Sequence, residues 1–148
     1  MIRIALAGIA EGGSLGSVTR LLWPLDDKVF PFPADVLTEL GADALDLAGA
    51  TRAAPVSFVE VRERYLPEWE FRGNTEHQKS RVAIQAVVMT SAGLTPDYYA
   101  DAGWWRVQDL ALFSFYALVI MVRIAAVRTG RSVADVCGQI AAARGVSI

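Results

Sequence analysis

Hydrophobic and polar positions alternate at the start of the chain. Residues 2–7 put Ile2, Ile4 and Leu6 on one side and arginine or alanine on the other, a period of two that predicts a half-buried strand. Residues 56–65 predict a second strand, because valines recur there among charged side chains. The pattern therefore indicates two or three short strands in the first half of the chain.

A short helix is predicted between these strands. Pro33 suits the first turn of a helix, and the charge of Asp35 complements the positive end of the helix dipole. We expect this helix to run from Pro33 to Leu40 and to stop at Gly41.

The second half of the chain carries stronger helix signals. Thr75 and Gln78 form a capping-box pattern, and the helix that they begin is expected to end at Gly93. Thr95-Pro96-Asp97 predicts a second, short helix.

Two further helices complete the C-terminal half. A long helix is predicted over residues 104–128, with Gly130 closing it. Ser132 and Asp135 are typical of the start of a last helix, which Gly145 ends. The apolar positions of this last helix share one face, which indicates that Cys137 is buried there as a small hydrophobic residue.

The segment Leu110–Val122 has no formally charged residue. A membrane span needs roughly 20 apolar residues, and Arg123 interrupts this run. We therefore interpret it as a central core helix that neighbouring elements cover on all sides. The alternatives are a membrane anchor and a helix shared across a homodimer interface, where Tyr116 would suit the edge.

Together these elements predict an α+β fold. A small N-terminal sheet of two or three strands packs against three or four C-terminal helices, with a long buried helix at the centre. The 148 residues have the length of one domain. Neither an internal repeat nor a long linker divides the sequence, so residues 1–148 are predicted to form a single globular domain.

Composition narrows the functional classes. The chain is 53% hydrophobic and has a net charge of −2. The negative charge argues against nucleic-acid binding, which normally needs a positive surface. The single cysteine excludes an internal disulfide, and the first apolar run is too short for a secretory signal. We expect a cytoplasmic protein that does not insert into a membrane.

A glycine-rich segment, Gly8–Gly16, follows the first predicted strand. That context favours a phosphate-binding loop, because glycines let backbone N–H groups approach phosphate oxygens. The sequence lacks the lysine of a P-loop and the Gly-x-Gly-x-x-Gly spacing of a dinucleotide fold, and Glu11 would repel a phosphate. We interpret the segment as a solvated turn.

The only histidine, His77, follows Arg72 by five positions. This Arg-x4-His spacing resembles the catalytic pair of HEPN-type ribonucleases, which implies proton transfer by His77 and phosphate stabilisation by Arg72. The residue after Arg72 is Gly73, where that family has a polar residue. The Phe-Arg-Gly-Asn stretch at 71–74 also resembles the Fic motif, although Trp69 and Glu70 stand where its histidine would lie. The alternative interpretation of His77 is an exposed residue at a helix start.

Other chemistry has little support. One cysteine and one histidine cannot supply a zinc site, so neither a metal nor another cofactor is predicted. Carboxylates at Glu60, Glu63, Glu68, Glu70 and Glu76 could divide acid and base roles, but no pattern predicts that two of them converge.

Aromatic residues mark the candidate binding surface. Four of them gather on both sides of Gly103, and tyrosine and tryptophan dominate binding hot spots. They are Tyr98, Tyr99, Trp104 and Trp105. The two tryptophans could equally anchor the long helix in the core.

The sequence thus favours a small non-enzymatic protein that acts by protein–protein contact, of the immunity, antitoxin or accessory-factor type. A partner protein or a second copy of the chain would account for the high apolar content. The alternative is an RNA-acting or nucleotide-handling enzyme centred on Arg72 and His77.

Overall fold

The computed structural model describes residues 2–12, 32–50, 53–66, 73–94 and 107–148, with the backbone alone at 32–34, 73–80 and 107–112. The regular elements of this part of the chain are all helices, joined by turns and short loops, and no sheet forms in it. The elements are α1 (Ile2–Ala10), α3 (Phe32–Leu47), α4 (Phe58–Arg64), α5 (Gly73–Ser91), α7 (Val107–Thr129) and α8 (Val133–Ala143). The predicted α+β fold with an N-terminal sheet is therefore wrong.

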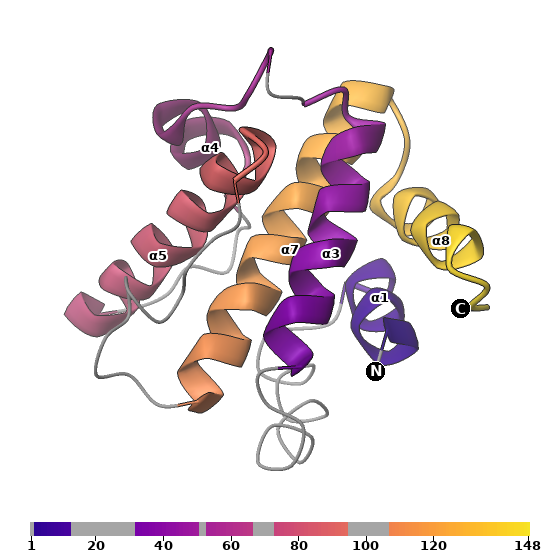
Figure 1. Ribbon diagram of the computed structural model, residues 1–148, viewed down its shortest axis with the longest axis horizontal. Helices are drawn as coiled ribbons and strands as arrows, with labels where there is room; N and C mark the ends of the chain where they lie inside the picture. Colours follow the sequence, from indigo (N-terminus) through magenta and orange to yellow (C-terminus); the bar gives the residue numbers. More distant parts are fainter. Residues whose placement is uncertain (1, 13–31, 51–52, 67–72, 95–106) are drawn as a thin grey trace.

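The helices lie in three neighbouring groups, which Figure 1 shows from left to right. Helices α4 and α5 form one group, α3 and α7 form the centre, and α1 and α8 form the third, at which both ends of the chain lie. Helix α7 packs against α3, α5 and α8.

The core is built around α7. Every side chain from 113 to 122 is buried, as are those of 124–126. A helix that is apolar on all sides is stable in water only when neighbours cover all sides. The prediction of a central core helix is confirmed for these residues, and Tyr116 is buried within the chain rather than at an edge.

The first predicted strand is part of α1. The segment Ile2–Ala10 also carries a helical pattern, because Ile2, Ala5, Leu6 and Ile9 follow the i, i+3, i+4, i+7 spacing. The last three of these are buried. The short stretch fits both periods, and packing against α8 selects the helix.

The second predicted strand is helix α4. Ser57 caps this helix, since its side-chain oxygen accepts a hydrogen bond from the backbone N–H of Glu60 at 3.1 Å. Val61 and Tyr65, four residues apart, are buried on one face. The Ser-x-x-Glu signal at Ser57 and Glu60 outweighs the strand preference of the valines.

The predicted end of α3 at Gly41 is also wrong. The helix continues through Gly41 to Leu47, and its buried positions follow a helical spacing from Val36 to Leu45. Gly41 faces α7, where an added Cβ atom would lie 2.7 Å from the sulfur of Met121. Glycine allows the close approach of the two central helices here rather than ending one of them.

The helix ends predicted at Gly93, Gly130 and Ser132 are confirmed. The predicted start at Thr75 is wrong, because Thr75 lies inside α5, which begins at or before Gly73. The short helix predicted at Thr95-Pro96-Asp97 lies outside the described residues. Gly93 and Gly130 adopt left-handed backbone angles, with φ of 76° and 67°. The next residue after each donates a backbone hydrogen bond to a carbonyl five positions back, which is the Schellman motif. Ser132 caps α8 by accepting a hydrogen bond from the N–H of Asp135 at 3.0 Å.

Candidate functional site

Most of the residues singled out as sites by the sequence lie outside the described part of the chain. For His77 the structure describes only the backbone, which belongs to α5. The enzymatic and aromatic sites therefore stay predictions. The residues outside the described part are Glu68, Glu70, Arg72, Tyr98, Tyr99, Trp104 and Trp105.

The glycine-rich segment does not follow a strand. Gly8 lies inside α1, and a turn at Glu11 and Gly12 comes directly after that helix. Residues 13–16 lie outside the described part. The strand-then-loop context that favoured a phosphate site is therefore wrong, because the preceding element is a helix.

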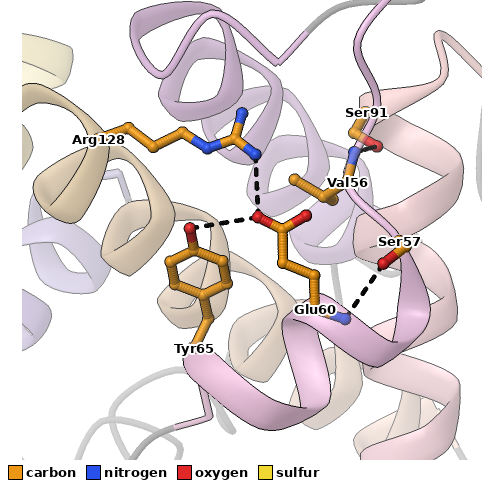
Figure 2. Close-up of polar contacts among 6 residues, drawn as sticks. All are labelled: Val56, Ser57, Glu60, Tyr65, Ser91 and Arg128. Atoms are coloured by element: carbon orange, nitrogen blue, oxygen red, sulfur yellow. Dashed lines mark hydrogen bonds and ion pairs between the residues drawn. The ribbon is translucent and has the colours of Figure 1, made fainter.

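The main polar cluster of the described residues joins α4 to the end of α7 (Figure 2). A guanidinium nitrogen of Arg128 donates to Oε1 of Glu60 at 3.1 Å. The hydroxyl of Tyr65 donates to the same oxygen at 3.4 Å. One carboxylate thus accepts hydrogen bonds from two side chains that come from different helix ends.

The neighbours of Arg128 favour its protonated, positively charged form. Partial burial lowers the pKa of Arg128, but hydrogen bonding and attraction to Tyr65 and Glu60 outweigh it, and the pKa lies above its ordinary value. The side chains of Arg128 and Glu60 are each 28% exposed. A guanidinium that stays protonated and a carboxylate that it neutralises form a structural tie rather than a proton-transfer pair.

A second set of polar contacts secures the segments on either side of α4. The buried hydroxyl of Ser91, at the end of α5, accepts a hydrogen bond from the N–H of Val56 at 3.1 Å (Figure 2). The same hydroxyl donates to the carbonyl of Val88 at 2.8 Å. Arg123 of α7 donates to the carbonyl of Leu66 at 2.9 Å. These bonds satisfy backbone groups that the core would otherwise leave without partners.

A third polar contact ties α8 to α3. Arg144 donates to Asp43 at 2.7 Å through Nε and to Glu39 at 3.2 Å through a terminal nitrogen. Hydrogen bonding to Asp43 is the main cause of a raised pKa at Arg144. Within the described ranges, no three His, Cys, Asp or Glu side chains are placed to hold a metal ion.

Cys137 lies on the buried face of α8, as predicted. Burial disfavours the thiolate and raises the pKa of the thiol to about 12. A thiol held in its neutral form is a poor nucleophile, so Cys137 is a core residue in this conformation.

Sequence reasoning named Glu60 among five carboxylates but missed its partners. Arg128 lies 68 positions away, and no local spacing predicts such a contact. The helical spacing from Val61 to Tyr65 was the available signal that α4 turns one face inward, with Tyr65 beside the core.

Comparisons with known proteins add no family. The sequence matches no protein-family model, and neither a curated protein nor a solved structure is significantly similar to it. Among the described residues, no single helix is long and apolar enough to cross a bilayer. Two helical segments, Phe113–Thr129 and Val133–Ala143, are long and apolar enough only when taken together, and the chain bends by 107° between them.

Proposed function

We propose that this chain is a small, cytoplasmic, non-enzymatic protein that acts by binding another protein chain, as immunity, antitoxin and accessory factors do. The observation that supports this proposal is that bonded polar side chains and exposed apolar side chains occur next to one another in the sequence where α4 meets the end of α7. There, Glu60, Tyr65 and Arg128 bond to one another. The neighbours Val59 and Val127 are 51% and 65% exposed.

This arrangement has the composition of a contact surface. Val59 and Val127 each directly precede one member of the Glu60–Arg128 ion pair. In this pair a guanidinium nitrogen of Arg128 lies 3.1 Å from Oε1 of Glu60, so α4 and the end of α7 are in contact. Apolar side chains beside a fixed arginine are typical of protein interfaces, where arginine is enriched. Tyr65 is only 5% exposed and so adds little area to this surface.

The proposal places the contact away from the centre of α7. The described residues of the apolar run are buried within the chain, so a second copy does not contact them in this conformation. We therefore take the junction of α4 and α7 as the contact surface and a second copy of the chain as the first partner to test.

Light scattering from 1 to 100 µM, roughly the range of weak to moderate association, tests this. We expect a concentration-dependent dimer that Val127→Glu abolishes without changing the circular dichroism spectrum. Ile148→Glu is the matched control, because Ile148 is also exposed, at 45%, but lies at the far end of the chain after α8. A monomer at all concentrations, or equal effects of both variants, argues against self-association at this surface.

The enzymatic alternative makes a different prediction. If Arg72 and His77 act on RNA, His77→Ala abolishes cleavage of a single-stranded RNA probe while the protein stays folded. On the binding proposal, His77→Ala leaves both the fold and self-association unchanged.

A further inference from the structure

Helix α1 is connected to the other described helices mainly through α8. Extensive contact of α1 within the described ranges is with α8, whereas α3 and α5 each pack closely on α7. Figure 1 shows α1 and α8 together on one side of the central pair. The buried side chains of α1 are Ala5, Leu6 and Ile9. An isolated helix of nine residues is marginal in water, so α1 depends on α8 for its stability.

Helix α8 is itself held by few groups. It contacts α7 and α3 far less extensively than those two helices contact each other. Its polar link to α3 is Arg144, which bonds to Asp43 and Glu39. The side chain of Arg144 is 29% exposed and that of Glu39 is 64% exposed. Ion pairs so open to water are weak and are screened by salt.

The connection from α7 to α8 suits a hinge. Three residues, 130–132, separate the two helices, whose axes meet at 107°. Gly130 has φ of 67°, and Ser132 caps α8 through its own side chain. At the end of α7 the N–H of Arg131 donates to the carbonyl of Ala126. Rotation between Arg131 and Ser132 therefore leaves both helix ends satisfied, and α8 can leave α7 without breaking its last turn.

We propose that α1 and α8 open together as one cooperative unit whose internal packing is lost, hinged between Arg131 and Ser132, with the ion pairs of Arg144 holding the closed form. Helices α3, α5 and α7 stay folded during this opening. Proteins open in contiguous units, and those with the least buried contact open first. The opening uncovers the side of α7 on which α8 packs, and it is independent of the proposed self-association.

The single cysteine reports on this motion. Cys137 is buried in the closed form, and opening exposes its sulfur. The test is the rate at which 5,5′-dithiobis(2-nitrobenzoate) labels the whole chain at increasing urea concentration. The thiolate attacks the reagent disulfide and releases one thionitrobenzoate anion, which is measured by absorbance. Circular dichroism follows global unfolding in the same samples.

We expect labelling at low urea to proceed through an opening with a smaller urea dependence than global unfolding, because less surface is exposed. Arg144→Ala should speed labelling about threefold to tenfold, as expected for loss of two exposed ion pairs. Arg128→Ala, which breaks the ion pair between α4 and α7, is the matched control and should leave low-urea labelling unchanged.

A change in α1 tests whether the packing between α1 and α8 is lost in this opening. Leu6→Ala removes a fully buried side chain from α1 and should speed labelling of Cys137 more than tenfold. If that variant does not fold, Ile9→Val is the milder replacement, with about a twofold to tenfold effect.

Three outcomes overturn the proposal. One is wild-type labelling with the same urea dependence as global unfolding. Another is equal acceleration by Arg128→Ala and Arg144→Ala. The third is low-urea labelling that the α1 variants do not change, which would mean that the packing of α1 against α8 survives the opening that exposes Cys137.

Discussion

Gly41 gives the sharpest test of how the two central helices pack. It lies in the interior of α3 and faces Met121 of α7. A Cβ atom added at this position would lie 2.7 Å from the sulfur of Met121 and closer still to its terminal methyl group. Met121 is fully buried, so its side chain must move within a packed core to accommodate alanine.

Two effects of Gly41→Ala oppose one another. Alanine is favoured over glycine in a helix interior by about 1 kcal/mol. Extra volume in a packed core costs about 1–3 kcal/mol. Because the clashing atoms are the flexible end of a methionine, we place the cost near the middle of that range, at about 2 kcal/mol. The variant should then lose about 1 kcal/mol of unfolding free energy, which lowers Tm by about 2–4 °C.

Gly138 supplies a control with the opposite sign. It lies inside α8, and a Cβ atom added there would have no neighbouring atom within 4 Å. Gly138→Ala therefore keeps the propensity gain of up to about 1 kcal/mol without the clash. In a Met121→Ala background the clashing sulfur and methyl group are gone, so Gly41→Ala should also become stabilising there.

Urea unfolding followed by circular dichroism measures the stability of Gly41→Ala, Gly138→Ala, Met121→Ala and the double variant at positions 41 and 121. We expect a lower midpoint for Gly41→Ala and a higher one for Gly138→Ala, with slopes that match the parent chain. The double-mutant cycle should give a coupling of about 1–3 kcal/mol between positions 41 and 121. A Gly41→Ala midpoint that rises as much as that of Gly138→Ala would refute the close approach of α3 and α7.

Three further predictions use the same unfolding assay. Ser91→Ala should lower the unfolding free energy by about 1–3 kcal/mol, because it leaves the buried N–H of Val56 without its acceptor. Thr90→Ala is the control and should have a much smaller effect, since the Thr90 hydroxyl bonds to a carbonyl of its own helix. Equal losses in the two variants would contradict this. Ser132→Ala should cost about 1 kcal/mol through loss of the α8 cap, and an unchanged midpoint would count against the cap. Burial raises the pKa of the Cys137 thiol from 9.0 to about 12. Between these two pH values the thiol stays protonated in the folded chain but loses its proton in the unfolded chain. The unfolding free energy should therefore fall as pH rises from 9 to 12. Cys137→Ala should reduce that slope, by up to about 1.4 kcal/mol per pH unit; the same slope in both proteins would show that the thiol ionises without unfolding.

The sequence by itself determined several helix ends in the C-terminal half. Ser132 places an acceptor at the start of α8, and Gly93 and Gly130 supply the left-handed backbone that ends α5 and α7. Caps and left-handed glycines act within a single helical turn. A local pattern is therefore enough to predict them. The apolar run of α7 likewise required burial on every side, because water would otherwise contact it.

The N-terminal half shows where local pattern is insufficient. Residues 2–10 fit the spacing of both a strand and a helix, and the helix is selected by α8, more than 120 positions away in the sequence. At α4 a local signal was present, since Ser57 and Glu60 form a cap, but the valines suggested a strand. Short segments carry weak preferences of their own, and tertiary contacts decide between them.

Only the tertiary structure decided what Gly41 and Glu60 do. A glycine in a sequence can end a helix or let two helices approach closely. Gly41 does the latter, because Met121 of α7 occupies the space that a Cβ atom would need. In the sequence, nothing distinguishes Glu60 from the other carboxylates. The fold places Arg128, 68 positions away, within hydrogen-bonding distance of it. Such contacts depend on where whole helices lie, because packing and charge pairing act between residues that are near in space and distant along the chain.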